Sequence, residues 1–161
     1  MTTVSSGNFV VSSGQTSSGI VVLGSGTLEV RSGGSVTSTV MSNHGIDYIS
    51  GLASATLVSS GGQEYVESGG IARGTVLTDG GSQAVFHGGT ASGTVLTGFG
   101  DQYVYGSAIS TVVSGYGGFQ FVFVGGVASG TVLNYGAVQN VSSGGVAVGA
   151  VLLGGRERQR R

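Results

Sequence analysis

The chain repeats one short segment, with variations, along its whole length. Residues 71–89 read IARGTVLTDGGSQAVFHGG, and close copies follow at 90–106 (TASGTVLTGFGDQYVYG) and 127–145 (VASGTVLNYGAVQNVSSGG). With the Thr of the GTVL motif as anchor, successive copies are 17, 19, 17, 19, 19, 17, 20 and 19 residues apart. The anchors are Thr3, Ile20, Thr39, Thr56, Thr75, Thr94, Thr111, Thr131 and Ala150. A fixed short period indicates a repeat architecture in which each copy packs on the next.

Each copy predicts two short strands, neither longer than about five residues, separated by Gly-rich turns. The chain has 34 Gly and no Pro, and its apolar residues alternate with a period of two rather than the 3.6 of a helix. Gly and Ser at this density also occur in flexible linkers. Apolar residues make up 39% of the chain and recur in register, however, which argues against disorder.

Strands this short are stable only when each pairs with its counterpart in the next copy. We therefore predict an all-β fold, a parallel β-helix of about eight coils with 17–20 residues per coil. At about 4.8 Å per coil the rod would be roughly 40 Å long. Residues 1–155 are predicted to form a single domain, and the basic tail 156–161 to be disordered.

Aligned columns predict which side chains face the core. In the second strand, alternation turns the outer members of triplets such as Gln102-Tyr103-Val104 inward and the middle one outward. Gln83, Gln102, Gln120 and Gln139 would then stack as a buried amide ladder. In the first strand two adjacent columns are apolar, and the one after the anchor Thr and Val is predicted to face inward. That column is Val22, Met41, Val58, Leu77, Leu96, Val113, Leu133 and Leu152.

Charge and hydropathy exclude several classes of protein. Without residues 156–161 the body carries two Arg against six acidic residues, so nucleic acid is not an expected partner. No apolar run approaches the ~20 residues of a membrane span, so we expect no direct membrane insertion. The first residues have neither a basic segment nor a long apolar core, so we expect no signal peptide.

No motif predicts an enzyme or a cofactor site. His44 and His87 have no Cys or His at ligand spacing, which argues against a metal site. Gly98 to Asp101 is similar to one turn of a calcium-binding repeat, but such repeats need an Asp in every copy. An ice-binding array of paired Thr is also unsupported, because only Thr37 and Thr39 are so spaced.

Aromatic residues gather in the second strands of successive copies, and alternation turns several of them outward. We predict an interaction surface formed by Tyr48, Tyr65, Tyr103, Tyr105 and Phe121. The alternative is that these rings only stack on one another and stabilise neighbouring coils.

Copies of the form GG-x-A-S-G-T-V-L-x-x-G-G-x-Q-x-V resemble the passenger (stalk) repeats of AIDA-type self-associating autotransporter adhesins of Gram-negative bacteria. The resemblance covers residues 20–155 and is strongest over 71–145. It implies a right-handed parallel β-helix, displayed at the cell surface or secreted, that promotes cell aggregation, adhesion and biofilm formation through self-association.

In some members of that family a partner heptosyltransferase modifies Ser and Thr in the turns. The matching residues here are Ser59 and Ser60 in one SSGG turn and Ser142 and Ser143 in another. The resemblance therefore also offers a second function, in which the chain is an acceptor scaffold for O-heptosylation.

Overall fold

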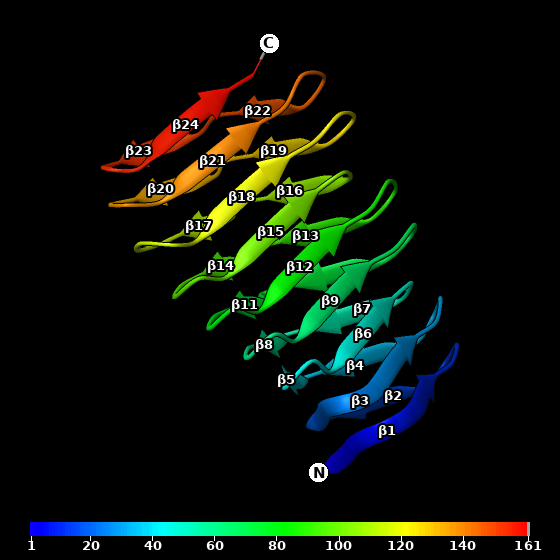
Figure 1. The fold of residues 1–161 in the computed structure, drawn as a ribbon. Helices are drawn as coiled ribbons and strands as arrows, with labels where there is room; N and C mark the ends of the chain where they lie inside the picture. Colours follow the sequence, from blue (N-terminus) through cyan, green and yellow to red (C-terminus); the bar gives the residue numbers. More distant parts are fainter. Residues whose placement is uncertain (161) are drawn as a thin grey trace.

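The chain winds into a parallel β-solenoid whose coils stack from the N-terminus to the C-terminus (Figure 1). This is seen in a computed structural model, which describes residues 1–160. Every named strand pairs in parallel with its counterparts in the neighbouring coils, and from β3 (Ile20–Val30) onward the pairings follow the predicted alignment of the copies, as in Gln83 opposite Gln102. In the first coil the predicted anchor is off by one residue, because Thr2 rather than Thr3 lies opposite Ile20, and the register shifts between Val4 and Ser6. The predicted all-β solenoid is confirmed.

Each full coil contains three strands rather than the predicted two. The first strands form the first arm: β5 (Val40–Ser42), β8 (Leu57–Val58), β11 (Val76–Leu77), β14 (Val95–Leu96), β17 (Val112–Val113), β20 (Val132–Asn134) and β23 (Val151–Leu153). The second strands form the second arm: β6 (Ile46–Ile49), β9 (Gln63–Val66), β12 (Ser82–Val85), β15 (Asp101–Val104), β18 (Phe119–Val122), β21 (Val138–Val141) and β24 (Arg156–Gln159).

The third strand of each coil belongs to a separate eight-stranded sheet. Its members are β2 (Thr16–Ser18), β4 (Ser35–Thr37), β7 (Leu52–Ser54), β10 (Ile71–Arg73), β13 (Thr90–Ser92), β16 (Ser107–Ile109), β19 (Val127–Ser129) and β22 (Val146–Val148). Only the central residue of each turns inward, usually an Ala such as Ala72 or Ala91. One inward residue is too few to produce visible alternation, so the sequence pattern did not reveal this sheet.

The first two coils differ from the others because their strands run through a corner. β1 (Thr2–Val11) and β3 (Ile20–Val30) are 10 and 11 residues long, well beyond the predicted limit of about five. β3 pairs with both β5 and β6 and so joins the two arms into one 16-stranded sheet. In the later coils a Gly-containing turn separates these strands.

The tail also differs from its prediction. Residues Arg156–Gln159 form strand β24, which pairs with β21, so the expectation of a disordered tail is wrong. The alternation of RERQ continues the repeat register, with Glu157 opposite Gln139 and Arg158 opposite Asn140. Backbone pairing to the preceding coil therefore orders a segment whose charge had suggested disorder.

The core is a set of straight columns running along the rod. The predicted inner column of the first strand is fully buried from Val22 to Leu133, and the inner column of the second strand is fully buried from Val30 to Val122. Leu152 is half exposed. Turn glycines allow the coils to approach one another: a Cβ on Gly70 would overlap the carbonyl oxygen of Ile49 in the preceding coil.

The predicted Gln ladder is present, and the anchor Thr residues complete it. Gln102, Gln120 and Gln139 each donate from Nε2 to Oε1 of the Gln one coil earlier, at 2.7 Å for Gln102 to Gln83 and 2.7 Å for Gln120 to Gln102. Thr111 donates from its hydroxyl to Gln102 Oε1 at 3.1 Å. These side chains are at most 1% exposed. The stacked row thus satisfies polar groups that would be costly to bury singly.

Two carboxyl groups begin this ladder. Glu64 accepts hydrogen bonds from Gln83 and from the Thr75 hydroxyl (2.9 Å), while Asp47, one coil earlier and opposite Glu64, has no partner for either oxygen. Both side chains are fully buried. Burial, and then the nearby charge of Glu64, hold the pKa of Asp47 well above its usual range. Burial likewise raises the pKa of Glu64, partly offset by its hydrogen bonds.

Removing the Asp47 carboxyl should stabilise the protein at neutral pH. Because burial raises the folded-state pKa, the contribution of this carboxyl to stability is fully present below its unfolded-state pKa of about 4 and is lost as pH rises through the folded pKa. Asp47→Asn should flatten this loss and raise the free energy of unfolding at pH 7 by about 1–3 kcal/mol. Urea unfolding between pH 4 and 8 measures it, with the exposed Asp79→Asn as control. An Asp47→Asn protein less stable than wild type at pH 7 would contradict the assignment.

Breaking the ladder at its centre should be costly. Gln102→Leu leaves the Thr111 hydroxyl and the Gln120 Nε2 group without their acceptor and removes one of the two donors to Gln83 Oε1, so we expect a loss of about 1–3 kcal/mol in unfolding free energy. Gln63→Leu is the matched control, since Gln63 lies on the outward face of the same arm and loses one partly buried hydrogen bond, from Tyr65, in place of the buried ladder. Equal losses in the two variants would mean that the ladder adds no stability.

Candidate interaction surface

The predicted aromatic residues come together on the outer face of the second arm. Tyr48 stacks on Tyr65 with ring centroids 5.2 Å apart, and Tyr103 stacks on Phe121 at 5.4 Å with planes only 8° from parallel. Alternation positions these rings, because the residues on either side of each ring are buried in the core.

A second row lies two residues further along in three successive copies and links the two pairs. Phe86 stacks on Tyr65 and on Tyr105, at 6.0 Å in each case, and Tyr105 stacks on Phe123 at 4.5 Å. The link passes diagonally because the middle position of β12 is Ala84, which has no ring. We call the whole cluster the aromatic surface: Tyr48, Tyr65, Phe86, Tyr103, Tyr105, Phe119, Phe121 and Phe123.

The aromatic surface is fixed in place yet remains partly open to solvent. Its rings cover one another, so they are half buried, with Tyr48 36% and Phe86 41% exposed. Polar contacts hold two of the tyrosines: Tyr65 donates to Gln63 at 2.9 Å and Tyr103 to Asp101 at 3.4 Å. Partial burial, and then the charge of Asp101, raise the pKa of Tyr103, so its hydroxyl stays protonated at neutral pH. The cluster offers rigid apolar area for contact.

Sequence reasoning missed a second group of aromatics, at the turn between the first and second strands. Phe99, Tyr116 and Tyr135 occupy this turn in three successive coils and are 67%, 67% and 68% exposed. Tyr116 and Tyr135 meet edge to face at 5.5 Å. Their common place in the repeat was visible in the alignment, but the absence of strand alternation there left no sign of their direction.

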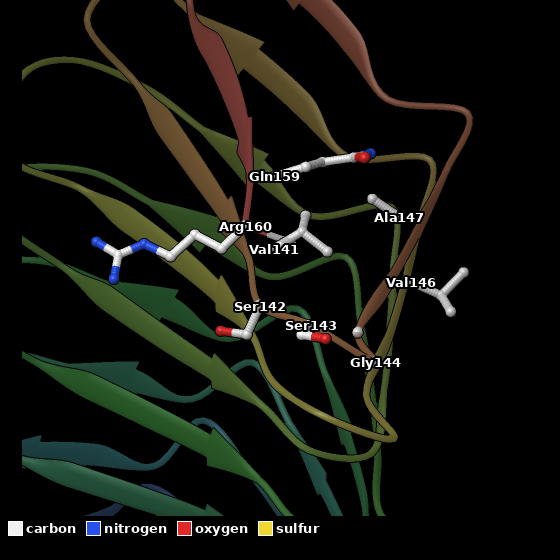
Figure 2. A pocket seen from close by; sticks show the side chains of 9 residues that line it. Val141, Ser142, Ser143, Gly144, Val146, Ala147, Gln159 and Arg160 are labelled. Atoms are coloured by element: carbon white, nitrogen blue, oxygen red, sulfur yellow. The ribbon is translucent and has the colours of Figure 1, made fainter.

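The candidate glycosylation residues lie in turns, as predicted. Ser60 is exposed in the turn between β8 and β9, with Ser59 half buried beside it. Ser143 is exposed in the turn between β21 and β22, and Ser142 is half buried. Figure 2 shows this turn beside a shallow hollow of about 310 Å³, which Gln159 and Arg160 also line. Their modification remains a prediction.

Nothing in the described part of the chain suggests a metal centre or a membrane helix. Residues 1–160 contain no group of three or more His, Cys, Asp or Glu placed to hold a metal ion. No helix long and apolar enough to cross a membrane occurs among them. The two buried carboxyls, Asp47 and Glu64, lie within the core column rather than in a surface cleft.

The coils and the aromatic surface define a class of protein: an elongated β-solenoid stalk. A family model described as the adhesin of the bacterial autotransporter system, probable stalk (AIDA), matches residues 49–100. A crystal structure of a TibC-catalysed, hyper-glycosylated fragment of TibA superposes with a TM-score of 0.85 and 35% sequence identity, covering 94% of this chain and 67% of that one. No curated protein matches. The chain belongs to the AIDA family of autotransporter adhesin stalks.

Proposed function

We propose that this chain is the surface-displayed stalk of a self-associating adhesin, and that it promotes cell aggregation, adhesion and biofilm formation by lateral contact between stalks. The observation that carries the proposal is the aromatic surface, which extends over the second arm from β6 to β18. Family membership supports the stalk role, which is structural rather than catalytic.

The geometry of the aromatic surface favours protein contact. Large exposed apolar patches on soluble proteins commonly mark interaction sites. Rings already held by stacking lose little conformational freedom when a partner covers them, so less of the contact energy is spent on ordering. The rows run along the rod, which allows two rods lying side by side to meet over several coils at once.

Removing two central rings should weaken lateral association. Tyr103→Ser combined with Phe121→Ser deletes a stacked pair from the middle of the aromatic surface, and we expect at least about a tenfold weaker self-association constant. Sedimentation velocity over a concentration series measures it. The matched control is Tyr116→Ser with Tyr135→Ser, which removes two more exposed rings from a different part of the molecule. Equal weakening by both pairs, or a wild type that stays monomeric, would contradict the proposal.

A second proposed role, compatible with the first, is that of acceptor scaffold for a partner heptosyltransferase. The hyper-glycosylated state of the TibA fragment supports it, as does the exposure of Ser60 and Ser143 in turns that a transferase can reach. Ser60 lies at a φ of 49° in a tight turn, and the residue is exposed.

Co-expression with a heptosyltransferase should add sugar to turn serines. We expect the intact mass to increase, and peptide mapping to locate the sugar at Ser59, Ser60, Ser142 or Ser143. Ser60→Ala with Ser143→Ala should lower the added mass. Thr75 and Thr94 are the internal controls, because they are 1% exposed and a folded acceptor should keep them unmodified. Sugar on these two residues, or an unchanged mass, would contradict the role.

A further inference from the structure

A groove runs along β21 on the outer face of the second arm. Its floor is formed by small or short side chains, including Asn140 and Ser142, while larger ones rise from the strands on both sides. On one side β18 contributes Phe121 and its neighbours, and on the other β24 contributes Arg158, directly across from Asn140. The groove has a volume of about 470 Å³.

The aromatic wall presents open ring faces to this groove. Phe121 is covered on one face by Tyr103, and Phe123 is covered on one face by Tyr105, with interplanar angles of 8° and 7°. These stacks run from coil to coil, and in the next coil the corresponding positions are Asn140 and Ser142, which have no ring. The far faces of both phenylalanines are therefore unstacked.

The opposite wall is formed by two arginines, Arg158 and Arg160. Alternation along RERQR turns Arg156, Arg158 and Arg160 outward, while Glu157 faces the core side and accepts a hydrogen bond from Gln159 at 3.0 Å. Figure 2 shows the side chains of Arg160 and Ser142 extending to the same side and that of Gln159 to the other.

Among the residues that the structure describes, these arginines have no acidic partner. Over residues 1–160 the one ion pair joins Arg31 to Glu29, at 2.7 Å, far from the groove. The acid nearest the aromatic wall is Asp101, which already accepts hydrogen bonds from the backbone N–H of Phe119 (3.2 Å) and from Tyr103. A row of unpaired guanidinium groups favours carboxylate, sulfate or phosphate, which guanidinium binds through paired hydrogen bonds.

We propose that this groove binds an acidic polysaccharide, whose sugar rings stack on the open faces of Phe121 and Phe123 and whose anionic groups pair with Arg158 and Arg160. The amide of Asn140 and the hydroxyl of Ser142 are placed to hydrogen bond with sugar hydroxyls. Three residues at alternate positions span about 13 Å along the strand, enough for several sugar rings in single file. An acidic peptide fits less well, because β21, the strand beneath the groove, already uses its backbone groups in ladders to β18 and β24.

The proposal goes beyond self-association, and the two are separable. Arg158 and Arg160 lie outside the aromatic surface, so Arg158→Gln with Arg160→Gln should weaken glycan binding while sedimentation velocity still shows wild-type association. Tyr103→Ser with Phe121→Ser alters both surfaces and is therefore left out of the glycan test.

Binding is measured by biolayer interferometry on immobilised polygalacturonate, with neutral dextran and poly-L-glutamate for comparison. We expect wild type to bind polygalacturonate, to ignore dextran, and to bind polyglutamate at least about tenfold more weakly. Arg158→Gln with Arg160→Gln should weaken polygalacturonate binding by at least about tenfold, because two charge-assisted contacts are lost. Phe123→Leu should also weaken it, by about threefold or more.

The matched control is Arg31→Gln with Arg73→Gln, which removes the same charge from other parts of the rod and should leave the affinity unchanged. Thermal unfolding of every variant confirms that it is folded. Three results would each overturn the proposal: equal loss of affinity in the two arginine pairs, equal binding of polyglutamate and polygalacturonate, or no binding of polygalacturonate by wild type. The first two would identify a general attraction between charges rather than a glycan groove.

Discussion

The backbone ladder between coils fixes every residue directly above its counterpart, at a spacing of about 4.8 Å. Each side chain in this fold consequently contacts the residue at the equivalent position in the neighbouring coils, which is often of the same type. A column of equivalent residues is therefore stable only if that residue type can stack on itself. Gln meets that condition in the core, where each amide both donates and accepts, and aromatic rings meet it on the outside. Carboxyl groups do not, because neither member of an ionised pair can donate. Asp47 and Glu64 are therefore the two residues of the buried polar column that do not meet this condition.

Much of this arrangement was predictable, because a period-two pattern repeated in register specifies both pairing and facing. The inward Gln column, the inner column of the first strand and the outward direction of Tyr103 and Phe121 all follow from it. The third sheet did not, since a segment such as Ile71–Arg73 has one inward residue and shows no period. Strand β24 was missed for another reason: the charge of its arginines was given more weight than their register with β21.

The same distinction applies to the candidate sites: residues in alternating strands could be placed from the sequence, and residues outside them could not. Strand residues of the aromatic surface could be assigned a direction from sequence, whereas Phe99, Tyr116 and Tyr135 could not, because their turn has no alternation. The groove along β21 depends on three strands at once: rings on β18, short side chains on β21 and arginines on β24. It could be recognised only after the order of the final strand was known. A site formed by a single column of equivalent residues can thus be predicted from the sequence. A site that lies between different columns can be identified only from the structure.

The direction of the inter-coil hydrogen bonds also determines how the rod responds to force. All of them lie nearly along the rod axis, so tension between its two ends would load the bonds of one coil at a time rather than shearing many together. Each coil that peels away releases 17 to 20 residues, or roughly 60 Å of extended chain. A stalk built this way yields in steps, and each step lengthens the tether before the next coil is loaded. Under a pulling force the stalk would therefore lengthen gradually instead of failing all at once.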